Sequence, residues 1–187
     1  AMGRALLGAE MAPFPAARYH FELPGSVQGF QMEAQVASAP ASLRNVPGHS
    51  RQGTRSLAIS FGPDSGTLRA GVYVFASPQQ LEQPGYYMTL SSSLYPGHMI
   101  ETEVELDAGA GADVEMALFV EVYPGQPGGE PGRYSSQVQT LAAGGRATLR
   151  WTVPQTAGLP VLRVGVEIHS NQDTSGTVHL DTLTWQG

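Results

Sequence analysis

The feature that most constrains the fold is a repeated pattern in which short segments of alternating apolar and polar residues are separated by clusters of glycine and proline. The chain of 187 residues contains 23 Gly and 14 Pro, the residue types that tight turns use. From Tyr19 onward no helical periodicity lasts longer than two turns, whereas a period of two residues indicates strands. This pattern predicts an all-β fold with about ten short antiparallel strands in a two-sheet sandwich of the jelly-roll type.

The turn residues also set the boundaries of the expected elements. Residues 1–18 contain a short stretch of helical character that Pro13 and Pro15 interrupt, and we interpret them as a linker or a cloning remnant. Residues 19–187 are expected to form one β-sandwich domain. The expected strands cover residues 19–23, 30–36, 55–61, 68–76, 86–91, 98–106, 114–123, 135–141, 146–153, 162–169 and 177–185.

The alternation predicts which side chains enter the core. In the segment 98–106, the apolar positions and Thr102 should point inward, and the row of Glu101, Glu103 and Glu105 should point outward. By the same parity Trp151 is expected in the core. A row of like charges on one strand is more typical of a solvated sheet face than of a catalytic acid and base.

Composition excludes several classes of function. Only 14% of residues are charged and 41% are apolar, which indicates a globular domain. Ten basic and sixteen acidic residues give a net charge of −6, and no basic run is present, which argues against a nucleic-acid partner.

No apolar run approaches the ~20 residues of a membrane span. The absence of cysteine excludes disulfides and Cys-ligated zinc but does not fix the compartment. Every basic residue other than histidine is arginine, which we attribute to a GC-rich, bacterial genome.

Motifs of common hydrolases are missing from the sequence. It contains no G-x-S-x-G elbow, and none of its histidines lies in an H-E-x-x-H spacing. His169 and His179 are expected on adjacent strands, but two histidines without a third ligand do not predict a metal site. We therefore expect a protein that is not an enzyme.

Three short motifs resemble those of galactose-binding-like jelly rolls, the group that includes the xylan- and glucan-binding modules of glycoside hydrolases. The motifs are the segments 21–30 (FELPGSVQGF), 53–57 (GTRSL) and 176–181 (GTVHLD). The segments 86–97 and 180–185 also resemble β-sandwich domains fused to ADP-ribosylglycohydrolase-like proteins. Both resemblances imply a β-sandwich, and the first implies binding of sugars.

The first resemblance also implies a structural calcium ion near the two ends of the domain. Glu22 and Asp181 would supply carboxylate oxygens, and backbone carbonyls near Arg51 and Gly53 would complete the shell. Calcium takes six to eight hard oxygen ligands, so two carboxylates suit it. The alternative is that Glu22 is exposed to solvent and Asp181 only accepts hydrogen bonds from a turn.

A polar sheet face is the candidate site for a carbohydrate or another sugar-containing ligand. Sugars are held by an aromatic ring together with hydrogen bonds from charged and amide side chains. The residues that could supply this mixture are Arg69, Tyr73, Phe75, Tyr123, Arg150, Arg163, Glu167 and His169. The alternative is an outer face closed by salt bridges, for example between Arg150 and Glu167.

The sequence therefore favours a non-catalytic carbohydrate-binding accessory module of a larger bacterial enzyme, with that enzyme's catalytic domain as its partner in cis. A structural domain that packs against such a catalytic domain or mediates oligomerisation is the alternative. A small glycosidase is the third hypothesis.

Overall fold

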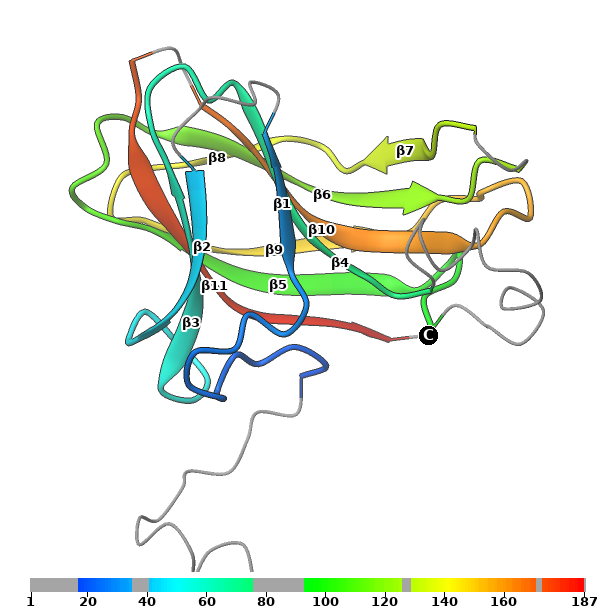
Figure 1. Cartoon of the computed structure of the whole chain (residues 1–187), viewed down its shortest axis with the longest axis horizontal. Helices are drawn as coiled ribbons and strands as arrows, with labels where there is room; N and C mark the ends of the chain where they lie inside the picture. The colour runs from blue at the N-terminus through cyan, green and yellow to red at the C-terminus, as the bar shows by residue number, and fades with distance from the viewer. Residues whose placement is uncertain (1–16, 35–40, 76–92, 126–128, 171–172, 187) are drawn as a thin grey trace, which may run out of the picture.

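The computed structural model describes residues 17–34, 41–75, 93–125, 129–170 and 173–186. These residues form strands, turns and loops, arranged as two packed antiparallel sheets (Figure 1). No helix in the described part of the chain is long and apolar enough to cross a membrane. The strands are β1 (Gln31–Ala34), β2 (Ala41–Pro47), β3 (Arg55–Phe61), β4 (Thr67–Tyr73), β5 (Met99–Leu106), β6 (Val114–Val122), β7 (Gly132–Ser135), β8 (Gln139–Leu141), β9 (Arg146–Thr152), β10 (Val161–His169) and β11 (Gly176–Gln186).

The all-β two-sheet sandwich is confirmed. The six-stranded sheet has the order β1-β4-β10-β6-β7, with β8 also paired to β6, and the five-stranded sheet has the order β2-β3-β11-β5-β9. From β3 to β6, and again from β8 to β11, consecutive strands alternate between the two sheets. This alternation is the arrangement expected for a jelly roll.

The core lies between the sheets and follows the predicted parity. Ile100, Val104 and Leu106 are buried, as is Thr102, while the three glutamates of β5 lie on the outer side. Trp151 packs against the core but is only half-buried, because β9 is the edge strand of its sheet. Strands β6 and β10 are buried along almost their whole length on both faces. The outer face of the six-stranded sheet is therefore covered by its own side chains.

Three strand assignments from the sequence are corrected by the structure. Residues 19–23 do not form a strand: only Tyr19 makes an isolated bridge, to Leu183. The segment 135–141 contains only the last residue of β7, a break at 136–138 and β8, and the two strands pair separately with β6. Strand β2 was missed because its alternation is weak and it ends at Pro47, a residue that an edge strand tolerates. The predicted strand at 86–91 lies outside the described residues.

Candidate functional site

The outer face of the six-stranded sheet carries two charged rows that run across the strands. One row aligns Tyr73, Arg163, Glu121 and Arg133, and the other aligns Glu33, Arg69 and Glu167. We call this surface the charged face. It consists of Glu33, Arg69, Tyr73, Phe119, Glu121, Arg133, Ser135, Arg163 and Glu167.

Ion pairs connect the arginines and glutamates of the charged face. Arg69 Nε lies 2.5 Å from Glu167 Oε1, and Arg133 Nη2 lies 2.6 Å from Glu121 Oε1. Glu33 reaches three guanidinium groups, at 3.6 Å from Arg69, 3.6 Å from Arg133 and 3.4 Å from Arg163. Three arginines and three glutamates therefore compensate one another.

The ion pair between Glu33 and Arg133 shows how far the sheet curves. Glu33 lies on β1 and Arg133 on β7, at opposite ends of the strand order. In a flat sheet their backbones would be at least about 19 Å apart, because four strand spacings of about 4.8 Å separate the two strands. Their side chains nevertheless approach to 3.6 Å, so the face is concave and its rims meet across it.

The centre of the charged face is closed to solvent as a result. Arg163 is 5% exposed and Glu167 4%, while Phe119 is completely buried. The Arg163 guanidinium lies over the rings of Tyr73 and Phe119, with its carbon 5.8 and 5.5 Å from their centroids. Burial raises the pKa of the Tyr73 phenol, although Arg163 opposes this shift. The accessible groups lie at the rim: Glu33, Tyr73, Arg133 and His169.

The structure brings together only part of the ligand site predicted from the sequence. Arg69, Tyr73, Arg163 and Glu167 share the charged face. His169 lies at the end of β10, where its Nδ1 is 3.1 Å from Thr67 Oγ1, and half-buried Tyr123 follows β6 directly.

Arg150 is not part of this face. It lies on the other sheet, where its Nε donates to Glu101 Oε2 at 2.6 Å. The predicted pairing of Arg150 with Glu167 is therefore wrong. The sequence analysis did not include Glu33 and Glu121 as site residues, although the alternation of β6 indicated the orientation of Glu121. It also missed Arg133, which lies in a stretch assigned to a loop.

A second polar region covers the outer face of the five-stranded sheet, where the loop 48–54 folds back towards β11. Asp181 Oδ2 accepts hydrogen bonds from the backbone N–H groups of Arg51 at 2.6 Å and Gln52 at 2.8 Å. The Glu22 carboxylate accepts from the N–H groups of Thr54 and Arg55, each at 2.9 Å. The loop therefore contacts, through backbone N–H groups, both carboxylates that the resemblance assigns to a calcium ion.

The fit of these residues to a cation depends on one oxygen atom of Asp181. Asp181 Oδ1 is buried and accepts no hydrogen bond from any residue that the structure describes. Burial raises the pKa of this carboxyl, and the nearby Glu22 charge raises it further, against the two backbone hydrogen bonds that lower it. Gly53 has a φ of +97°, a conformation that favours glycine, and a side chain there would also meet the Glu22 carboxylate. Two carboxylates, one of which has an unpaired buried oxygen, are the hard oxygen ligands that calcium prefers.

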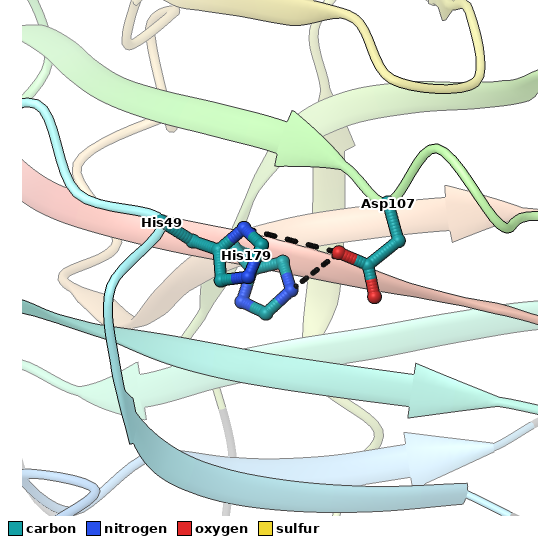
Figure 2. A group of neighbouring side chains, drawn as sticks. All are labelled: His49, Asp107 and His179. Carbon is teal, nitrogen blue, oxygen red and sulfur yellow. Dashed lines mark hydrogen bonds and ion pairs between the residues drawn. The ribbon is translucent and has the colours of Figure 1, made fainter.

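A histidine pair lies beside Asp107 on the same sheet face (Figure 2). His179 Nε2 is 2.9 Å from Asp107 Oδ1, and the rings of His49 and His179 stack with centroids 3.8 Å apart. Burial lowers the pKa of His179, and His49 lowers it further. An open cavity of about 270 Å³ is lined by both histidines, Asp181, Glu103, Glu105 and Arg146, among others.

A serine completes an arrangement that superficially suggests a nucleophile. Ser56 Oγ lies 3.3 Å from His179 Nδ1, which gives a Ser–His–Asp chain. Ser56 is fully buried, however, and its hydroxyl donates to the Gly48 carbonyl at 3.0 Å. A substrate cannot reach this oxygen, so the arrangement does not support acyl transfer.

Comparison with known proteins identifies the fold. A solved structure described as a study of the promiscuous specificity of carbohydrate-binding modules from the β-sandwich superfamily matches with a TM-score of 0.66 at 14% identity. The match covers 94% of this chain and 64% of that one. The CBM22-1 xylan-binding domain of Paenibacillus barcinonensis Xyn10C matches with a TM-score of 0.57 at 15% identity, over 90% of both chains. TmCBM61, solved with β-1,4-galactotriose, matches with a TM-score of 0.51 at 11% identity, over 94% of this chain and 98% of that one.

These similarities establish that the chain has the β-sandwich fold of carbohydrate-binding modules. No protein-family model matches the sequence. No curated protein matches it either. The resemblance to carbohydrate-binding modules is confirmed at the level of the fold, and the fusion to an ADP-ribosylglycohydrolase-like protein stays a prediction.

Proposed function

We propose that this domain is a non-catalytic module that binds a carbohydrate at the charged face. The observation that supports it is the convergence of Arg69, Tyr73, Arg163 and Glu167 on one concave face of a fold that carbohydrate-binding modules also have. Guanidinium and carboxylate groups can each form two hydrogen bonds with neighbouring sugar hydroxyls. The Tyr73 ring offers an apolar surface for the C–H face of a sugar.

The ligand would bind at the rim of the charged face, since the centre is closed. Glu33 is the most exposed member of the ion-pair network, with 47% of its side chain accessible, and its three contacts are longer than the Arg69–Glu167 and Arg133–Glu121 pairs. Rotation of Glu33 away from the face would free guanidinium donors of Arg133 and Arg163 for hydroxyl groups. The Glu167–Arg69 pair, which is short and buried, would stay in place.

Titration calorimetry with soluble xylan and with β-1,4-galactotriose tests the proposal, because these are ligands named for structurally similar modules. Tyr73→Ala should weaken binding at least about tenfold, as expected for loss of an aromatic contact worth about 1.4 kcal/mol. Arg150→Ala is the matched control, because Arg150 lies on the opposite sheet. Unchanged binding by Tyr73→Ala and Arg133→Ala would remove the charged face from consideration.

The internal pairing of the charged face favours a second function. A face whose arginines and glutamates mostly pair with one another leaves few polar groups for a sugar, although Arg163 Nε has no hydrogen-bond partner among the described residues. The domain would then act as a structural module that packs against a catalytic domain of the same enzyme or mediates oligomerisation. Absence of binding across a glycan array, together with co-purification with that catalytic domain, would favour this second function.

We also propose that Glu22 and Asp181 bind a structural calcium ion, with backbone oxygens of the loop near Arg51 and Gly53. The support is the unpaired Oδ1 of Asp181 and the adjacent Glu22 charge. The ion would neutralise both carboxylates and join the loop to β11 and to the segment before β1. Calcium should raise the melting temperature relative to a chelator in the wild type and in Asp113→Asn, but not in Asp181→Asn. Asp113 is a fitting control because it is an exposed carboxylate on another loop.

A further inference from the structure

Three possible metal ligands from distant parts of the chain meet on the outer face of the five-stranded sheet. His49 lies in the loop after β2, Asp107 directly follows β5, and His179 belongs to β11. One donor atom from each lies within 4.8 Å of the other two. Figure 2 shows both imidazole rings directed at the same oxygen, Asp107 Oδ1. His179 Nε2 is 2.9 Å from that oxygen and His49 Nδ1 is 3.9 Å from it.

The two ring nitrogens of His179 have different partners. Nδ1 lies 3.3 Å from the oxygen of buried Ser56, whose hydroxyl also reaches the Gly48 carbonyl at 3.0 Å. Nε2 lies 2.9 Å from Asp107 Oδ1. These contacts hold the ring in one orientation, with Nε2 directed at the carboxylate.

The contact between His179 Nε2 and Asp107 Oδ1 is a hydrogen bond in which one proton lies between the two atoms. A metal ion can replace that proton, because metals bind the unprotonated nitrogen of a neutral imidazole and an ionised carboxylate. The His49 ring stacks on His179 with centroids 3.8 Å apart and an interplanar angle of 9°, which brings a second imidazole to the same carboxylate. His49 Nδ1 also lies 3.2 Å from Glu105 Oε1.

The donor set and its spacing match a tetrahedral metal site. Zinc binds imidazole nitrogen at about 2.0–2.1 Å and carboxylate oxygen at about 2.0–2.2 Å, which places neighbouring ligand atoms about 3.3 Å apart. The distances from Asp107 Oδ1 to the two nitrogens, 2.9 and 3.9 Å, lie on either side of this value. Glu105 Oε1 supplies a fourth donor. Ser56 orients His179 through the ring nitrogen that the metal does not use, as partners of metal-ligating histidines do.

We propose that His49, Asp107 and His179, with Glu105 as the fourth ligand, bind a divalent transition-metal ion, and that Zn²⁺ fits the site best. An ion can enter because 41% of the His49 side chain and 37% of the Asp107 side chain are exposed, and because His49, Glu105 and His179 line the open cavity. The site differs in chemistry from the all-oxygen group at Glu22 and Asp181. Nitrogen ligands select zinc over calcium, and oxygen ligands select calcium.

This proposal is tested by calorimetric titration with ZnCl₂. The protein carries no histidine tag, has been treated with a chelator, and is then saturated with calcium. The wild type should bind one zinc ion. His49→Ala should lower the zinc affinity by about tenfold to a hundredfold, the range found when supporting residues of metal sites are lost. His169→Ala is the matched control, a half-exposed histidine on the other sheet. Equal zinc affinity in the His49 and His169 variants, or absence of zinc binding by the wild type, would overturn the proposal.

Two further measurements separate metal binding from loss of structure or from protonation. Co²⁺ in the wild-type site should produce the visible d–d bands of tetrahedral coordination, and these bands should be absent in Asp107→Asn and retained in Asp181→Asn. If zinc leaves the nuclear magnetic resonance signals of the His49 and His179 rings unchanged, a proton keeps its place between His179 and Asp107 and the proposal is wrong.

Discussion

The outer faces of the two sheets differ in how their buried charged groups are compensated. On the charged face, each arginine lies against a glutamate, and the six side chains neutralise one another. On the outer face of the five-stranded sheet, Asp181 Oδ1 has no hydrogen-bond donor among the described residues, and the proposed zinc ligands gather around Asp107. The first face is therefore expected to contribute to stability through its own pairs, whereas the proposed calcium and zinc ions would stabilise the second.

The largest effect is expected for Glu167→Ala. This substitution removes the buried partner of Arg69 and the acceptor of the Ser135 hydroxyl, which lies 2.7 Å from Glu167 Oε2. Loss of one member of a buried ion pair costs about 3–5 kcal/mol, because the remaining charge stays buried without compensation. Urea unfolding would measure this loss. The control Glu101→Ala removes an exposed pair from the other sheet and should barely move the midpoint; similar losses in both variants would contradict the proposed difference between the faces.

A smaller loss is expected where the backbones under the charged face approach most closely. Gly165 of β10 lies opposite Gly71 of β4, and a Cβ on Gly165 would lie 2.0 Å from the Ala70 carbonyl oxygen. Gly165→Ala must push β4 and β10 apart beneath the ion pairs, at a cost of about 1–3 kcal/mol. Thermal unfolding would show it, with Gly109→Ala as the control, since a Cβ at Gly109 meets no atom. If Gly165→Ala melted at the same temperature as the wild type, strands β4 and β10 would be able to move apart at little cost, contrary to this prediction.

Cations should stabilise the second face through two separate groups of ligands. At a calcium concentration about a hundredfold above its dissociation constant, binding to the native state alone adds about 2.7 kcal/mol. Asp181→Asn should abolish this gain and preserve zinc binding, whereas His49→Ala should do the reverse. Melting curves with each ion alone and with both would measure these effects. If either substitution removed the response to both ions, the face would contain one mixed site.

The parts of this molecule that the sequence predicted are those governed by local periodicity. Strands β5, β10 and β11 alternate clearly because one side of each faces the core, and the inward position of Thr102 followed from the same rule. Glu22 and Asp181 were identified from motifs, and the structure brings both to the loop 48–54.

The remaining features depend on tertiary geometry. No local sequence pattern predicts that the six-stranded sheet curves enough for Glu33 to reach Arg133. The contact of His49, Asp107 and His179 depends on how one loop folds over another strand. The sequence analysis paired His179 with His169, but the structure places them on the outer faces of different sheets.

The smallest effect, and the sharpest distinction between the faces, should come from salt. Arg150 and Glu101 form their pair with 60% and 31% of their side chains exposed, so solvent and ions reach it. At 1 M NaCl the screening length falls to about 3 Å, and any stabilising coupling between these two residues should vanish. The coupling between Arg69 and Glu167 should persist, because 17% and 6% exposure keeps salt away from it. Double-mutant cycles by urea unfolding at low and high salt measure both couplings. If the two couplings declined equally with salt, the charged face would be as open to solvent as the opposite sheet, and a sugar could reach its centre as well as its rim.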